Sequence, residues 1–223
     1  MAYTQQNLIF KVLFTERKFY LQNESFIYRT KVLLTMHIEE MFEKYRDWKL
    51  LKIFLNNPDH PFYTKEISRN TGIGSGTVNN FLKNIHKDNI LTKEIVGNVH
   101  LYNLNNESEI VKQIKILNTI INLKKINLIE EFIKNDNSIL SIILYGSHAN
   151  GEYDSKSDID LLILTNKKNQ FSNTIQKLEN KIKKIISPQI FTISDWQKIK
   201  EKDIIFYESI IRNHIVLYGS GLP

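Results

Sequence analysis

The most constraining feature of the chain is a glycine-serine turn followed by two closely spaced aspartates, set between two apolar runs. The first run, residues 139–145, leads directly into Gly146-Ser147. Ten residues then separate Ser147 from Asp158-Ile159-Asp160, which opens the second run, 161–164. Short apolar runs bounded by turn residues predict buried strands, and residues two apart in a strand face the same side. We therefore expect the carboxylates of Asp158 and Asp160 to lie together and to face the turn, as a site for a divalent cation and a polyphosphate.

This block resembles the nucleotidyltransferases of the DNA polymerase β type, in particular their small bacterial and archaeal members. The resemblance covers about residues 125–220, and its pattern is Gly-Ser, about ten residues, then Asp-X-Asp in a strand. It implies a Mg²⁺-dependent enzyme that transfers a nucleoside monophosphate, AMP from ATP, to a hydroxyl of a protein, an RNA or a small molecule. It also implies that Asp158 and Asp160 are catalytic and hold Mg²⁺, and that Gly146 and Ser147 bind the nucleotide. The alternative is a surface turn whose acids are merely solvated.

The chain departs from that family at the third acid, which catalytic members carry on a neighbouring strand. The corresponding run here, 189–193, contains no Asp or Glu. We expect Gln189 in that place and Asp195 as the cap of the next helix. A neutral amide is a poor base and a weak metal ligand. The departure therefore supports a second hypothesis, a transcriptional regulator whose transferase-like domain binds nucleotide without catalysis. For His148, an exposed bystander is favoured over a contact to phosphate.

The N-terminal half has the signals of three helices and a hairpin. Apolar residues recur at helical spacing up to Asn56, Thr64 and Ser75 are of the residue types that cap helices, and Gly97-Asn98 is a two-residue hairpin joint. The predicted elements are helices over 36–56, 65–70 and 76–88 and strands over 90–96 and 99–104. This order resembles the winged helix-turn-helix DNA-binding modules of prokaryotic regulators, over about residues 38–105.

The third predicted helix has a polar face opposite its buried stripe. That face carries Gly76, Asn80, Lys83 and Lys87. Asn and Lys can contact base edges or phosphates from a helix in the major groove, so these four are candidate DNA-binding residues. The alternative is the solvated face of a packing or dimerisation module, since residues 36–108 carry nine basic and nine acidic side chains.

We therefore predict an α+β chain with a winged helix-turn-helix domain and a polymerase-β-like nucleotidyltransferase domain that has a small mixed sheet. The expected division is an N-terminal extension over 1–35, the winged helix over 36–106, a linker helix over 107–124 and the transferase domain over 125–223. A second helix is expected to follow the linker helix from about Asn122, and the apolar stripe of the pair serves either a core or a homodimer. Residues 215–218 are expected to form a closing strand.

Composition excludes several other classes of protein. The chain of 223 residues has no cysteine, so it has neither disulfides nor thiolate zinc sites. It has no run of about 18 apolar residues and no secretory signal pattern, so no membrane partner and a cytoplasmic location are expected. The net charge of +6 is spread over the chain, and non-specific attraction to phosphate is expected to be modest.

Overall fold

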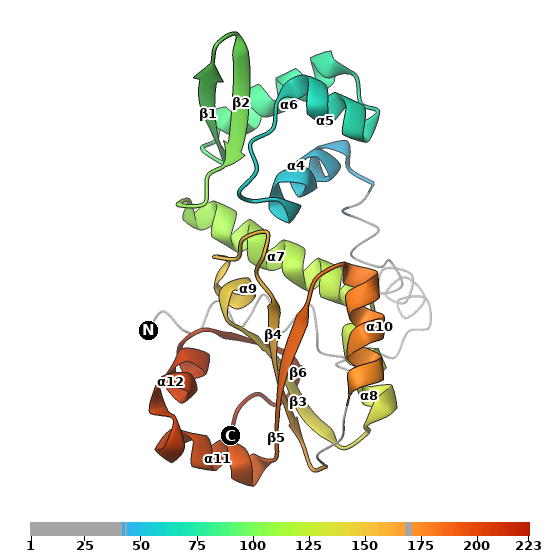
Figure 1. The fold of residues 1–223 in the computed structure, drawn as a ribbon, viewed down its shortest axis with the longest axis vertical. Helices are drawn as coiled ribbons and strands as arrows, with labels where there is room; N and C mark the ends of the chain where they lie inside the picture. The colour runs from blue at the N-terminus through green and yellow to red at the C-terminus, as the bar shows by residue number, and fades with distance from the viewer. Residues whose placement is uncertain (1–41, 43, 168–170) are drawn as a thin grey trace, which may run out of the picture.

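The computed structural model describes residue 42 and residues 44–167 and 171–223 (Figure 1). The expected N-terminal extension and the start of the helix expected from residue 36 lie outside this range. The described elements are α4 (Arg46–Asn56), α5 (Thr64–Thr71), α6 (Ser75–Lys87), β1 (Leu91–Val96), β2 (Val99–Leu104), α7 (Glu109–Lys125), α8 (Leu128–Asn135), β3 (Ile139–Tyr145), α9 (Ser147–Asn150), β4 (Ile159–Thr165), α10 (Ser172–Ile182), β5 (Ile186–Phe191), α11 (Ile193–Lys202), α12 (Ile204–Arg212) and β6 (His214–Gly219).

The N-terminal region packs three helices and a hairpin around one apolar core. Its fully buried side chains include Leu50, Phe54, Ile67 and Leu82. The hairpin is confirmed: β1 and β2 pair antiparallel, and their last pair, Val96 with Val99, is joined by the two expected turn residues. The chain order is helix, helix, helix and hairpin. Figure 1 shows α6 and the β1–β2 hairpin at the upper end of the molecule.

Some of the expected helix boundaries in this region are wrong. Helix α4 begins at Arg46, and Lys44 and Tyr45 before it are not helical, so the helix expected over 36–56 is interrupted at these two residues. Thr64 and Ser75 are the first helical residues and not the caps; the residues before them occupy the cap positions and make no side-chain capping bond. Helix α5 ends at Thr71, one residue beyond the expected 65–70, and Gly72 caps it with a φ of 69°, which suits a residue without a Cβ.

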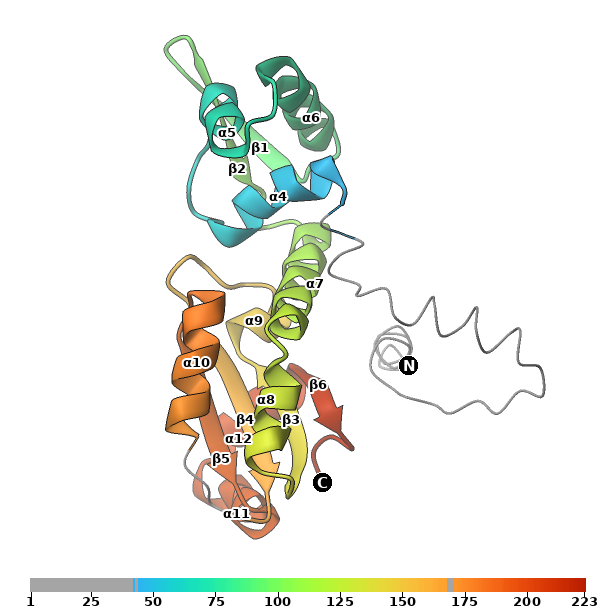
Figure 2. The same ribbon diagram turned by 90° about the vertical axis from the view of Figure 1, so that its right-hand side faces the viewer.

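Helix α7 belongs to the cores of both regions. Val111, near its start, is fully buried in the N-terminal core, whereas Leu123, near its end, is buried in the core of the C-terminal region. Figure 2 shows α7 descending from the N-terminal helices past α9 to α8. The break between α7 and α8 falls at Ile126-Asn127, later than the expected Asn122, and Asn127 takes a φ of 56° there. None of the described helices is long and apolar enough to cross a membrane.

The C-terminal region is built on the expected mixed sheet, with strand order β5-β4-β3-β6. Strand β3 pairs antiparallel with β4 and β6, and β4 pairs parallel with β5. Alternation along β4 sends Ile159, Leu161 and Ile163 into the core under α8 and α10, and sends Leu162 and Leu164 into a second core under α11 and α12. Figure 1 shows these two helix pairs on opposite sides of the sheet. The C-terminal region is therefore a three-layer α+β unit.

Two strands of this sheet matter for the site. β6 pairs only with β3 among the described strands and closes one edge, as expected for the chain's last apolar run. β5 begins at Ile186, three residues before the run 189–193 in which the sequence indicated this strand. That earlier start changes which residue of β5 faces the aspartates.

Candidate active site

The turn at Gly146 lies directly against the carboxyl group of Asp160. Gly146 has φ 69° and ψ −157°, a backbone conformation that is essentially restricted to glycine. A Cβ added at this position would overlap Asp160 Oδ2 and would lie 3.1 Å from Asp160 Cγ. The structure therefore brings Gly146, at the end of β3, together with Asp160, in β4, and no other residue type fits that turn without displacing the acid.

The two aspartates form an electrostatically coupled pair at the same end of the sheet. Both side chains are half-buried. Burial raises the pKa of Asp160, and the neighbouring Asp158 carboxylate raises that pKa further. A raised pKa means that two ionised carboxylates are unfavourable here unless a cation lies between them. Oxygen donors without sulfur or imidazole are the ligands that a hard divalent cation prefers, so the pair suits a cation of that class.

A third carboxylate does not join this pair among the described residues, where no three His, Cys, Asp or Glu side chains cluster. The residue of β5 that pairs with Asp160 is Ser187, whose Oγ donates a hydrogen bond to Asp158 Oδ2 over 3.2 Å. The expectation that Gln189 occupies this place is wrong, since Gln189 pairs with Leu162 and is exposed.

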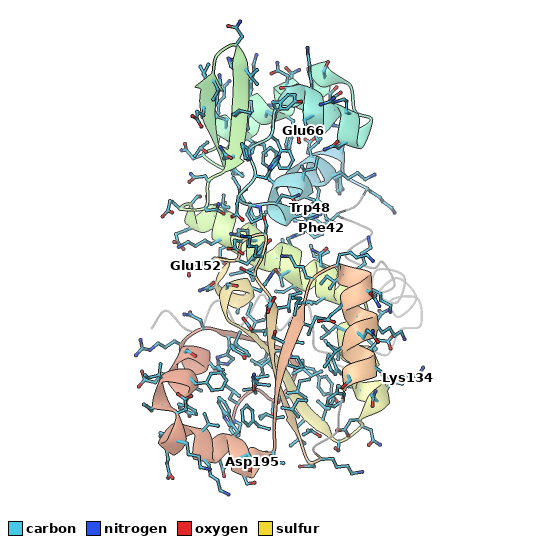
Figure 3. The ribbon with its side chains drawn as sticks, viewed as in Figure 1. Phe42, Trp48, Glu66, Lys134, Glu152 and Asp195 are labelled. Carbon is cyan, nitrogen blue, oxygen red and sulfur yellow. The ribbon has the colours of Figure 1, made fainter. Side chains whose placement is uncertain are left out.

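Asp195 does not supply the missing acid and does not cap the next helix. The N-cap of α11 is Thr192, whose hydroxyl accepts a hydrogen bond from the Asp195 N–H over 3.1 Å. Because β4 and β5 run parallel, the end of β5 lies at the far end of the sheet from Asp160. Figure 3 shows Asp195 there, away from the turn.

Tyr145 is a neighbour of the pair that the sequence did not indicate. It is the last residue of β3 and the cross-strand partner of Asp160. Burial raises the pKa of Tyr145 to about 12, and the charge of Asp160 contributes to the rise. Its phenol is therefore a proton donor and not a base at neutral pH. The pairing places Ser187, Asp160 and Tyr145 in one row across three strands, a relation that depends on strand register.

His148 is buried, so the expectation of an exposed bystander is wrong. Its side chain is 3% exposed, its ring stacks on Tyr153 at 4.1 Å, and Nδ1 lies 2.9 Å from the Thr119 hydroxyl. Nε2 has no hydrogen-bond partner among the described residues. Burial lowers the pKa of His148 to about 4, with the nearby Lys184 adding to the fall. The ring is therefore neutral at neutral pH and presents no charge to a phosphate.

The helix that follows the turn is short, which limits the backbone donors available to an anion. α9 has only four residues, and Ser147, its first, is half-buried. The N–H groups of Ala149 and Asn150 both donate to the Gly146 carbonyl, over 3.0 and 3.3 Å. A phosphate at this turn would be held by the Ser147 hydroxyl, by a cation between the aspartates and by backbone N–H groups other than these two.

The four candidate DNA-binding residues lie together on α6, apart from the turn and the aspartates. Gly76, Asn80, Lys83 and Lys87 are all exposed, while the apolar residues of the same helix face the N-terminal core. The structure thus groups the predicted residues into two sets, one on the sheet and one on α6.

Comparisons with known proteins agree with the chemistry of the sheet region. Residues 127–221, less than half of the chain, match the family model "Polymerase beta, Nucleotidyltransferase". A Methanocaldococcus jannaschii protein provisionally named a protein adenylyltransferase is 31% identical over 84 residues, which are 38% of this chain and 59% of that protein. The match thus spans less than two thirds of the relative's length.

A solved structure described as a toxin-antitoxin with AMP-PNP is also similar to this chain. It is 18% identical, with a TM-score of 0.32, and the match covers 42% of this chain and 71% of that one. The family model and the site geometry coincide on the same segment, which contains the turn, both aspartates and the four-stranded sheet. Residues 127–221 therefore contain a region that matches the nucleotidyltransferases of the polymerase β type.

Proposed function

We propose that the chain is a Mg²⁺-dependent nucleotidyltransferase that transfers AMP from ATP to a hydroxyl group. The observation that carries this proposal is the packing of the Gly146 backbone against Asp160, with Asp158 charged beside it. This arrangement supplies what a triphosphate needs, namely a turn that admits close approach and two carboxylates that hold a divalent cation. The similarity to a protein provisionally named a protein adenylyltransferase favours a protein hydroxyl as the acceptor.

The residues of the site have separate tasks in this mechanism. Asp158 and Asp160 would hold the cation, which when bound neutralises charge on the phosphates and the pyrophosphate leaving group. The Ser147 hydroxyl is a neutral donor to a phosphate oxygen at the turn. Tyr145, protonated at neutral pH, is a further donor at the same end of the sheet. Ser187 keeps Asp158 oriented through its 3.2 Å hydrogen bond.

The second candidate function is a regulator that binds nucleotide without turnover. It is favoured by Ser187, which stands where a third carboxylate would complete the ligand set. A serine hydroxyl near two carboxylates is a poor base, so the attacking hydroxyl would have to lose its proton without a carboxylate on this strand.

We also propose that the N-terminal region is a winged helix-turn-helix that binds DNA through α6. Its support is the chain order of three helices and an antiparallel hairpin, together with the exposed polar face of α6. Two exposed lysines there, Lys83 and Lys87, suit phosphate contacts, and Asn80 suits a base edge.

Nucleotide transfer is tested by incubating the full chain with Mg²⁺, ATP labelled on the α-phosphate and candidate acceptor proteins. Label transfer that disappears in Asp158→Asn supports the enzyme. Asp47→Asn is the matched control, because this exposed aspartate of α4 forms an ion pair with its neighbour Arg46. Mg²⁺-dependent ATP binding without transfer to any acceptor supports the regulator, and absence of both refutes the two candidates together.

DNA binding is tested by a gel shift with DNA from the promoter of the chain's own gene at several salt concentrations. Lys83→Ala and Lys87→Ala are each expected to weaken binding and to reduce the salt slope by about 1. Lys134→Ala is the control, since Lys134 is exposed on α8 at the other end of the molecule (Figure 3). Unchanged mobility of the DNA at low salt would remove this role.

A further inference from the structure

The segment that joins Ser147 to Asp158 is held from outside by the N-terminal region. The Tyr153 hydroxyl donates a hydrogen bond to the Leu55 carbonyl over 3.0 Å, and the Ser155 N–H donates to Asp59 Oδ2 over 3.0 Å. Leu55 lies in the last turn of α4 and Asp59 lies just beyond it. Two acceptors of the N-terminal region therefore fix a segment whose ends are both site residues.

Tyr153 transmits this contact to the turn. It is 2% exposed, and its ring stacks on His148 with an angle of 11° between the planes. His148 is the residue immediately after Ser147 and is itself tied to Thr119 of α7. A displacement of Tyr153 would therefore move the His148 ring, and His148 is the residue next to Ser147, which is proposed to face the nucleotide.

Helix α7 packs against the same segment. Gly151 has a φ of 78°, and a Cβ there would overlap the Lys112 carbonyl oxygen and lie 2.8 Å from its carbon, so the two backbones are in direct contact. Lys112 Nζ also lies 3.6 Å from Glu152, which Figure 3 shows at the junction of the two regions. Lys115, which is also in α7, is 1% exposed, and its Nζ lies 4.6 Å from the centre of the Tyr153 ring.

The buried part of this connection, 148–151 and Tyr153, has few alternative conformations because it packs on α7 and on the N-terminal region. Residues 154–156 are exposed, and Ser155 among them is held by its hydrogen bond to Asp59. The separation between Ser147 and Asp158 depends on that conformation. Metal and phosphate recognition require their ligands to be held within a fraction of an ångström of the productive geometry.

We propose that Tyr153 and Asp59 are positioning residues of the nucleotide site, and that the N-terminal region sets the affinity of that site through them. The inference rests on the proposed function, since it concerns the same turn and aspartates. Neither residue touches the nucleotide in this scheme. By thermodynamic linkage, a ligand that moves the N-terminal region changes nucleotide affinity, and nucleotide changes the affinity for that ligand by the same factor.

The test uses the full chain and a non-hydrolysable ATP analogue with Mg²⁺, measured by calorimetry well below the melting temperature of each variant. Asp59→Ala removes the acceptor for the Ser155 N–H, and Tyr153→Phe removes the hydroxyl but keeps the stacked ring. Each is expected to weaken analogue binding by about threefold to tenfold, the equivalent of one lost hydrogen bond. Asp47→Ala is the control in the same region, because its carboxylate bonds the neighbouring Arg46.

A conservative variant and an exchange measurement separate positioning from general destabilisation. Asp59→Asn retains an oxygen acceptor and is expected to recover most of the affinity lost in Asp59→Ala. Hydrogen exchange at the Ser155 amide should be faster in Asp59→Ala, and the analogue should slow this exchange in the unmodified chain. Faster exchange in Asp59→Ala with unchanged analogue affinity overturns the inference. Failure of the unmodified chain to bind the analogue overturns the proposed function instead, and the inference with it.

Discussion

Replacing Gly146 by alanine tests the geometry of the turn most directly. The backbone there, with φ 69° and ψ −157°, costs an L-residue about 1–3 kcal/mol. The new methyl group also overlaps Asp160 Oδ2, and relief of such crowding in a packed site costs about 1–3 kcal/mol more. We expect Gly146→Ala to lower the free energy of unfolding by about 2–6 kcal/mol. The melting temperature should fall by about 4–24 °C, at about 2–4 °C for each kcal/mol in a chain of this length.

The assay pairs this variant with Gly76→Ala and follows unfolding by calorimetry and nucleotide binding by titration. Gly76 lies in the first turn of α6, and a Cβ there meets nothing within 4 Å. Alanine favours a helix over glycine by up to about 1 kcal/mol, so this control should keep or slightly raise the melting temperature. It should bind nucleotide as the unmodified chain does, because α6 lies away from the turn.

Only Gly146→Ala should lose nucleotide affinity as well as stability, because relief of the overlap moves Asp160 away from Asp158. A Gly146→Ala protein with the melting temperature and the nucleotide affinity of the unmodified chain would refute the packing described at the turn. Loss of stability with unchanged nucleotide affinity would support the backbone strain described at Gly146. It would also show that the turn does not shape the nucleotide site.

Three further outcomes follow from the site. Ser187→Asp places a third carboxylate beside Asp158 and should raise Mg²⁺ affinity by about one order of magnitude in a calorimetric titration, whereas Ser187→Ala should not. Asp160→Asn should raise the melting temperature of the metal-free protein at neutral pH. Burial and Asp158 raise the pKa of Asp160, so its ionised form costs stability above that pKa and the gain should vanish in acid. Burial lowers the pKa of His148 from 6.5 to about 4, so the unfolded chain binds its proton more tightly between these values. Stability should therefore fall by about 3 kcal/mol as the pH drops through that window, and urea titrations of His148→Phe, which cannot titrate, should lack this dependence.

The parts of the site that are local in the sequence could be predicted from it. Gly146 and Ser147 directly follow β3, Asp158 directly precedes β4 and Asp160 lies in β4. These two strands are adjacent in the chain and pair with each other, so spacing and alternation are enough to place Gly146 against Asp160. The hairpin was equally predictable, since its strands are joined by two residues that favour a tight turn.

The residue that faces the aspartates from β5 could not be predicted in the same way. Strand β5 is reached through α10, and its register is fixed by the pairing of Ile159 with Ile186. The strand begins at Ile186, before the run 189–193 that the apolar pattern indicated, and Ser187 instead of Gln189 takes that position. Because side chains alternate with a period of two, the error kept the correct face but selected the wrong residue.

Burial of a single polar side chain was also beyond the sequence. His148 is enclosed by Tyr153 and by Thr119 of α7, which comes from a part of the chain about thirty residues earlier, and only tertiary packing brings α7 over it. Similarly, Thr192 and not Asp195 caps α11, because the helix begins at Ile193, three residues earlier than a cap at Asp195 would place it, and both residue types suit a cap.

The sharing of α7 between two cores has a practical consequence for anyone who wishes to dissect the molecule. A fragment that stops before this helix keeps Leu50 and Phe54 but loses Val111, which is fully buried against them. A fragment that begins after it loses the support beneath Gly151 and the partner of His148. Each fragment would expose apolar surface that is buried in the intact chain. Each is therefore expected to aggregate or to have a lower melting temperature than the intact chain.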